Sequence, residues 1–171
     1  MTQLAYMSVT GAKQGVFKAQ STLVARQDKW IPILAFEMAL ESPRDANTGL
    51  ASGKRRFLPL RIVKEWGAAS AQALSACAAN EALREVTFEF ERAKAHGPHV
   101  VFETVKLTNA SITSVVRAMG RPSSLAEGAK TALAAEDKAL GDPLSWEEWT
   151  FVFQRIEVVD VRGQTSFTGV A

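Results

Sequence analysis

The residues best suited to metal or nucleophilic chemistry in this sequence are two histidines and one cysteine. His96 and His99 flank Gly97-Pro98, and no cysteine or carboxylate beside them completes a metal site at a familiar spacing. Glycine and proline between them are typical of a hairpin turn, so we expect exposed histidines there. Cys77 stands alone in an alanine-rich stretch, where a packed thiol is the common outcome. We therefore predict no metal site and no nucleophile.

Four glutamates lie in two pairs within strand-like segments. Glu147 and Glu148 are adjacent, so on a strand they point to opposite faces and cannot form a carboxylate pair. Glu89 and Glu91 share a face, but their alternation with apolar residues is typical of a solvated strand face. The short motifs of serine hydrolases, phosphate loops and zinc proteases are missing from the sequence. We therefore assign no catalytic residue and expect no cofactor, and a hydrolase that uses Glu147 or Glu89 is the weakest alternative.

Five basic residues gather in one strand-like segment. The chain as a whole carries 20 basic and 18 acidic residues, a near balance that argues against a dedicated nucleic-acid binder. Only Phe57 and Trp66 lie close enough to interleave aromatic rings with these charges. We expect the basic strand to pair with the acidic face of Glu85, Glu89 and Glu91, in the same chain or in another subunit. A binding module for nucleic acid or carbohydrate stays the alternative. The basic residues are Lys54, Arg55, Arg56, Arg61 and Lys64.

Length and composition predict one globular domain over residues 1–171. Hydrophobic residues make up 47% of the chain, enough for a sizeable core. The single cysteine excludes an intrachain disulfide and fits a reducing compartment. The first residues, MTQLAYMSVTGAKQG, lack the pattern of a secretory signal, and no apolar run is long enough to span a membrane. We expect synthesis in the cytoplasm, no membrane insertion, and any export by a route that reads no N-terminal signal.

Alternating apolar and polar residues predict strands along most of the chain. In the last of them the apolar face changes parity between Phe153 and Ile156, which a bulge or strong twist near Gln154-Arg155 reconciles. Asn109-Ala110 is a similar bulge or bend, and Arg162–Ala171 is predicted to be a polar tail. The expected strands are Leu4–Thr10, a turn or short strand pair in Ala12–Lys18, Gln20–Arg26, Trp30–Glu41, Lys54–Trp66, Leu83–Arg92, His99–Asn109, Ala110–Met119 and Ser145–Val161, the longest.

One helix is expected, over the alanine-rich stretch Ala68–Ala79. Ser70 can act as its N-cap, and Asn80 suits its end. About seven strands and one helix predict a β-sandwich or barrel. The stripe expected to face the core consists of Ala71, Leu74 and Ala78, with Cys77 beside it.

Two segments depart from the strand pattern. Ser42–Ser52 is rich in turn formers and is longer than a usual connection, a property often linked to function. Gly120–Pro143 contains two prolines and three glycines around an alanine-rich part, Leu125–Leu140, with a thin apolar face. We interpret residues 120–143 as an insertion or long loop.

Four segments together resemble the Hcp (hemolysin-coregulated protein) family, which forms the inner tube of the bacterial type VI secretion system. They are GKRRFLPLRIVKEW with the helix after it, CAANEALREVTFEFER, ETVKLTNASITSV and EEWTFVFQRIEVVDV. The residues of these segments agree with the family, and so do their order and spacing along the chain. The resemblance covers most of the chain.

The resemblance implies a mainly β fold, a compact β-barrel or sandwich of two antiparallel sheets with one flanking α-helix. It implies hexameric rings that stack into a hollow tube, propelled by a contractile sheath from a baseplate with a spike protein at the tip. The lumen of such rings can carry effector proteins, and the family in its core form is not enzymatic. Some members carry a C-terminal toxin domain, which we do not expect here because only Arg162–Ala171 follows the last predicted strand.

The resemblance also implies where subunits meet. It makes Ser42–Ser52 the extended loop that contacts the next ring, whereas Gly120–Pro143 is longer and richer in alanine than the common pattern. Closing six copies into a ring would cover strand edges that are an aggregation hazard in a monomer. The predicted stacking residues are Arg44, Asp45, Asn47, Thr48 and Leu50, and the subunit-interface candidates are Lys54, Arg56, Arg61 and Glu89.

Overall fold

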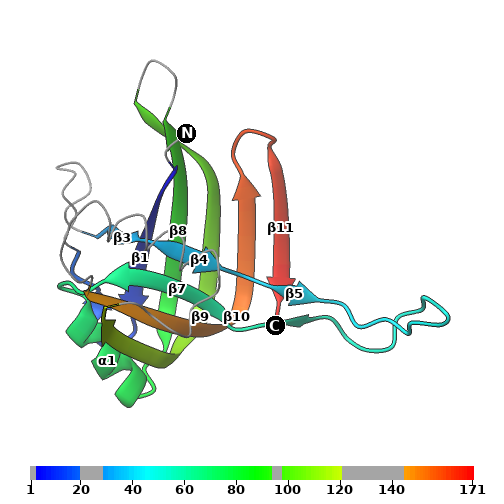
Figure 1. Ribbon diagram of the computed structural model, residues 1–171, viewed down its shortest axis with the longest axis horizontal. Helices are drawn as coiled ribbons and strands as arrows, with labels where there is room; N and C mark the ends of the chain where they lie inside the picture. The colour runs from blue at the N-terminus through cyan, green and yellow to red at the C-terminus, as the bar shows by residue number, and fades with distance from the viewer. Residues whose placement is uncertain (1–2, 20–28, 94–97, 121–144) are drawn as a thin grey trace.

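The computed structural model describes residues 3–19, 29–93, 98–120 and 145–171, and in these residues the protein is mainly β with one short helix (Figure 1). The predicted strand Gln20–Arg26, almost all of the predicted insertion and His96 lie outside the described residues. Within the parts of the chain that the structure describes, no helix has the length and apolarity needed to cross a membrane.

The described strands form one large antiparallel sheet and one small one. Nine strands of the described residues belong to the large sheet, whose central order is β2-β1-β8-β9-β10-β7-β4, with β11 paired to β10 and β3 to β1. β3 pairs with β1 near one end of that order, and the next strand along the chain, β4, pairs with β7 at the other end, so the two close part of the large sheet into a barrel. The strands are β1 (Gln3–Gly11), β2 (Gly15–Val16), β3 (Ile31–Ile33), β4 (Ala35–Glu37), β5 (Leu40–Glu41), β6 (Arg56–Phe57), β7 (Leu60–Glu65), β8 (Leu83–Ala93), β9 (His99–Met119), β10 (Ser145–Asp160) and β11 (Thr165–Val170).

The barrel closure breaks two strands that the sequence predicts as continuous. Trp30–Glu41 is divided into β3, β4 and β5, because the chain changes its partner from β1 to β7 at Leu34 and from β7 to β6 after Glu37. Lys54–Trp66 is divided into β6 and β7 around Leu58 and Pro59. Proline has no N–H to give to a ladder, so an interruption at Pro59 follows from its chemistry.

The C-terminal region differs from the sequence prediction as well. The predicted polar tail Arg162–Ala171 contains β11, which pairs with the C-terminal part of β10. The two segments predicted on either side of Asn109-Ala110 are one strand, β9, of 21 residues. At 16 residues β10 is therefore not the longest strand.

The predicted change of apolar face in β10 is confirmed. Phe153 and Ile156 are both buried, although they have opposite parity along the strand. Asn109 on β9 takes a left-handed backbone conformation, with φ of 51°, and its side-chain amide donates to Gln154 Oε1 at 3.2 Å. The bend therefore lies at Asn109 opposite Gln154, whereas the register shift between β9 and β10 falls between Thr150 and Phe151.

Helix α1 (Ser70–Ala78) packs on the sheet through its smallest residues. The predicted stripe is wrong, because Leu74 is 39% exposed and Ala71 and Ala78 also face solvent. Methyl side chains let the helix backbone approach the strands closely, a fit that a leucine cannot give. The predicted helix end is confirmed, since Asn80 takes a positive φ of 49° just beyond the last turn. The stripe that faces the core is Ala69, Ala73 and Ala76.

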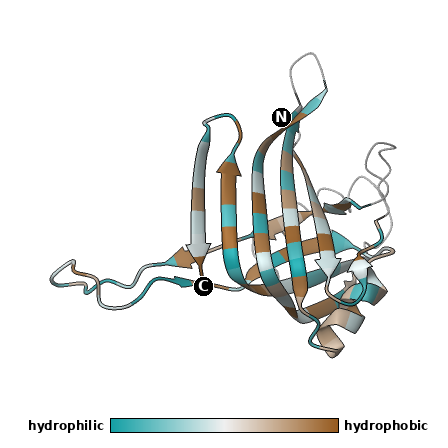
Figure 2. Ribbon diagram, turned by 180° about the vertical axis from the view of Figure 1, so that it is seen from behind, coloured by the Kyte–Doolittle hydropathy of each residue, from teal (hydrophilic) through white to brown (hydrophobic). Residues whose placement is uncertain are grey.

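Aromatic rings fill the centre of the barrel. Trp149 packs edge-to-face against Phe17 and Phe151, and Phe151 in turn packs against Phe88. All four side chains are fully buried. Figure 2 shows hydrophobic and hydrophilic residues alternating along the long strands, as the sequence pattern predicts for strands with one face on a core.

Candidate functional site

A long hairpin projects from the body of the protein, beyond β5 and β6 (Figure 1). We call its residues 42–55 the arm. The predicted loop Ser42–Ser52 falls within it, but it is not structureless. Arg44 and Ala51 form a bridge, Ser52 N–H donates to Pro43 O at 3.1 Å, and Asp45 N–H donates to Leu50 O at 2.9 Å. The arm is therefore a narrow, hydrogen-bonded extension of the small sheet.

The tip of the arm is closed by the carboxylate of Asp45. Its Oδ1 atom accepts hydrogen bonds from the backbone N–H groups of Asn47 and Thr48, at 2.9 and 2.7 Å, and from the Thr48 hydroxyl at 3.0 Å. The Thr48 backbone bond is the main reason why the pKa of Asp45 lies below its ordinary value. Leu50 lies beside this turn with 69% of its surface exposed. The structure thus brings all the predicted stacking residues together at one tip.

The base of the arm is held by an ion pair and an aromatic contact. The Arg56 guanidinium lies 2.7 Å from the Glu41 carboxylate, across β5 and β6. The ring of Phe57 packs edge-to-face on Phe153, with centroids 5.4 Å apart, and also lies against Phe167 of β11. These contacts fasten the arm to β10 and β11.

The four predicted subunit-interface residues do not lie together. Lys54 and Arg56 are exposed at the arm, whereas Arg61 is exposed on β7 opposite Glu37. Glu89 lies on β8, which β9 and β10 separate from β7. The interface prediction therefore describes three separate surfaces.

The expected pairing of the basic strand with the acidic face is wrong within this chain. β7 lies between β10 and β4, and Glu85 of β8 pairs instead with Lys106, at 2.7 Å. Glu91 is also buried rather than solvated. Since Lys64 is buried and Arg56 already has an acidic partner, the basic strand is not the continuous charged groove that a nucleic-acid module needs.

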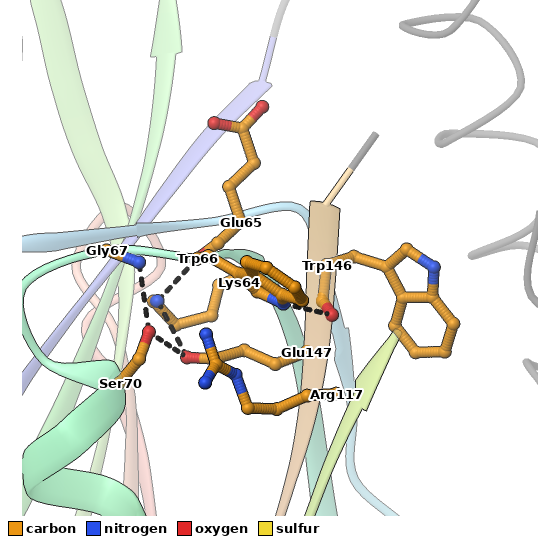
Figure 3. Close-up of polar contacts among 8 residues, drawn as sticks. All are labelled: Lys64, Glu65, Trp66, Gly67, Ser70, Arg117, Trp146 and Glu147. Carbon is orange, nitrogen blue, oxygen red and sulfur yellow. Dashed lines mark hydrogen bonds and ion pairs between the residues drawn. The ribbon is translucent and has the colours of Figure 1, made fainter. Parts of the chain in front are cut away.

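A buried charged cluster lies where β7, α1, β9 and β10 meet (Figure 3). We call Lys64, Ser70, Arg117 and Glu147 the Glu147 cluster. Glu147 Oε1 lies 2.9 Å from the Lys64 ammonium and accepts the Ser70 hydroxyl at 2.8 Å, and Glu147 Oε2 lies 3.2 Å from Arg117 Nε. The side chains of Glu147 and Lys64 are 0% and 4% exposed. Burial lowers the pKa of Lys64, and the hydrogen bond to Glu147 offsets part of this effect.

The backbone and two tryptophans complete the cluster. Ser70 is not the N-cap that the sequence predicts, because its Oγ instead accepts the Gly67 N–H at 2.9 Å and donates to Glu147. The guanidinium of Arg117 lies 4.2 Å from the centre of the Trp66 ring, and Trp66 Nε1 donates to Trp146 O at 2.8 Å. The cluster therefore joins four elements but leaves its carboxylate closed to a substrate.

Sequence reasoning did not find this cluster, although a signal was present. The prediction that Glu147 and Glu148 face opposite sides of the strand is correct. Glu147 is the one that faces the core, on the same side of β10 as Trp149 and Phe151. A charged residue in phase with core aromatics requires a buried partner. Lys64, in phase with the buried Ile62, meets that requirement.

The residues first considered for metal or nucleophilic chemistry stand apart. His99 is exposed at the start of β9, and Cys77 is half-buried on α1. Among the described residues, no group of three or more histidine, cysteine or acidic side chains is placed to hold a metal ion.

Comparison with known proteins gives one consistent result. A curated relative, the "Major exported protein" of Pseudomonas aeruginosa, is 29% identical over 123 residues, which is 67% of this chain and 72% of the relative. A solved double mutant of Hcp1 from E. coli EAEC 042 covers 98% of this chain and 97% of its own length, with a TM-score of 0.77 at 18% identity. Secreted protein Hcp3 from Pseudomonas aeruginosa covers 99% and 98%, with a TM-score of 0.73 at 21% identity.

At these identities the solved structures show a shared fold, which confirms the predicted mainly β architecture. The family itself is shown by a sequence model described as "Type VI secretion system effector, Hcp", which matches residues 6–159. Because that match spans nearly the whole of the described barrel, this chain belongs to the Hcp family of type VI secretion proteins.

Proposed function

We propose that the arm of this Hcp protein carries the contact between stacked rings of a type VI secretion tube. Membership of the family makes the chain a secreted structural protein of that tube and not an enzyme, and implies a homohexamer. The proposal adds the residues that join one hexamer to the next.

The geometry of the arm tip carries this proposal. A free loop would lose conformational entropy on docking, whereas the Asp45 turn and the backbone ladder already hold the tip in one shape. Exposed Leu50 offers an apolar contact, and the polar residues Arg44, Asn47 and Thr48 of the same tip are exposed as well. A small apolar centre with a polar rim suits a contact that must form on assembly and separate later.

We further propose the partners and the route that the family implies. The chain would be made in the cytoplasm and leave through the type VI apparatus with the spike, inside the contractile sheath and above the baseplate. Effector proteins would travel in the lumen of the rings. Family membership supports these partners, because each belongs to the apparatus in which Hcp tubes act.

Deletion of Arg44–Leu50 tests the role of the arm. Light scattering of the wild type should give a ring of six 18.5 kDa chains, about 111 kDa. The deletion should leave the protein hexameric, with a mass lower only by the residues removed, and should shorten the stacked tubes seen by electron microscopy. Arg162→Ala, in the exposed turn after β10, is the control and should change neither property.

Two outcomes would contradict the proposal. A wild-type protein that stays a monomer at high concentration would argue against ring formation. Tubes of normal length after the deletion would place the ring-to-ring contact on another surface.

A further inference from the structure

We propose that Gly169, on the C-terminal strand β11, sets the direction of the arm by letting the Phe57 ring rest directly on the β11 backbone. This inference rests on the proposed role of the arm in stacking and names the residue that aims it. No sequence pattern pointed to Gly169, which falls in the segment that the sequence predicts as a polar tail.

The space above Gly169 is filled by aromatic carbon. A Cβ atom at this position would lie 2.5 Å from Phe57 Cζ and 2.9 Å from Phe57 Cε2, with Phe167 Cε1 at 3.1 Å. Non-bonded carbon atoms pack at about 3.5–4.0 Å, so even an alanine would have to displace the ring. Gly169 is buried, whereas its neighbours Thr168 and Val170 are exposed. The glycine is therefore required by close packing.

Phe57 connects Gly169 to the arm. It is the last residue of β6, and it pairs with Leu40 of β5 at the root of the hairpin. The next residue, Leu58, donates its N–H to Ala39 O at 2.9 Å, which ties the two sides of the root together. Beyond the root, the arm is held by its own ladder and turn. A displaced Phe57 ring would therefore tilt the root, and the tip would move with it.

The strand that carries Gly169, β11, is itself fixed to the barrel. β11 pairs with β10 from Arg155↔Val170 to Asp160↔Thr165, and Ala171 N–H donates to Gln154 O at 2.9 Å. The Phe57 ring also packs edge-to-face against Phe153 of β10, which is 7% exposed. The ring thus contacts both a core phenylalanine and the Gly169 backbone, and these two contacts give the arm a defined angle.

A change in the direction of the arm would change the distance between a spin label at its tip and one on the barrel. The labels are placed on Ala46→Cys at the tip and on Arg162→Cys at the β10–β11 turn, in a Cys77→Ser background. Pulsed electron paramagnetic resonance then measures the distance between them. Labelled chains are diluted with unlabelled ones so that each ring carries a single pair. We expect Gly169→Ala and Gly169→Val to shift or broaden the distance distribution and to shorten tubes several-fold, while the ring mass stays unchanged.

Two matched variants separate displacement from general damage. Thr168→Val changes the neighbouring exposed position and should leave both the distance and the tubes as in the wild type. Phe57→Leu combined with Gly169→Ala removes the clash and should move the distance back toward that of the wild type. This double variant also keeps the test available if Gly169→Val does not fold.

The outcomes distinguish the two proposals. An unchanged distance distribution in folded Gly169→Ala would overturn the positioning role of Gly169. A shifted distance with tubes of normal length would instead confirm that role and overturn the stacking function proposed for the arm.

Discussion

The Lys64 ammonium lies 2.9 Å from the Glu147 carboxylate, and both side chains are almost completely shielded from water. The pair links β7 to β10, and Ser70 of α1 shares the same carboxylate oxygen. Burial of two charges is costly, and their attraction with the added hydrogen bonds offsets that cost only while every partner is present. The pair therefore fixes how the helix and the strands meet more than it adds net stability.

Removing one charge should expose this dependence. Glu147→Gln leaves the Lys64 ammonium buried without its counter-charge, so we expect the free energy of unfolding to fall by about 3–5 kcal/mol. Denaturant unfolding followed by tryptophan fluorescence, at one fixed protein concentration, measures the change. Glu148→Gln is the matched control, because Glu148 points to the opposite face and is partly exposed.

Replacing both charges should restore most of the loss. The double variant Lys64→Met with Glu147→Leu removes the pair and fills the site with apolar side chains of similar size, a change that is often neutral or stabilising. If Glu147→Gln is as stable as the wild type, the burial of Lys64 does not depend on the charge of Glu147.

The small residues of α1 give a second prediction. Ala73 is fully buried against the sheet, so Ala73→Leu should overpack this contact and destabilise the protein by about 1–3 kcal/mol. Ala71→Leu, on the exposed side, should change stability by less than about 0.5 kcal/mol. Thermal melts of the two variants decide between the observed stripe and the one predicted from sequence, and equal effects would contradict the observed packing.

Glu81 gives a prediction about pH. Burial alone would raise its pKa, but hydrogen bonds from Gln14 and the Lys13 N–H outweigh burial and hold the pKa below the ordinary 4.5. Because the unfolded chain then binds more protons, this stabilisation is present above about pH 4.5 and is lost as the pH falls through the lower folded value.

Glu81→Gln should therefore destabilise the protein at pH 7, and the difference from the wild type should shrink on acidification toward pH 3. Unfolding free energies measured across this range check the slope. A difference that is independent of pH would mean that Glu81 acts through packing and not through its charge.

The exposed leucine at the arm tip gives a fourth prediction. Leu50→Asp places a charge where we propose an apolar contact between rings, so tubes should shorten strongly while the ring mass stays at that of a hexamer. Leu74→Asp, on an exposed helix position, is the control. Equal shortening in both variants would point to a general effect of charge instead of a contact at the tip.

Sequence patterns predict the strands of this fold where one face of a strand meets the core along its whole length. The alternation around Phe88 and Phe151 is clear, and both side chains are fully buried. The pattern fails at β11, whose residues are mostly exposed, and at Leu34, where the chain changes partners. In both places the strand is set by a neighbouring strand distant in sequence, which local periodicity cannot report.

The amino-acid sequence alone indicated the family, the mainly β class and a long polar loop at Ser42–Ser52, because these follow from local patterns and from ordered motifs along the chain. Only the tertiary structure decided that Lys64 meets Glu147, that Ala73 and not Leu74 faces the core, and that Gly169 seats Phe57. Each of these depends on which distant segments lie side by side. A side chain's type limits what it can contact, but the packing of the whole barrel selects its partner.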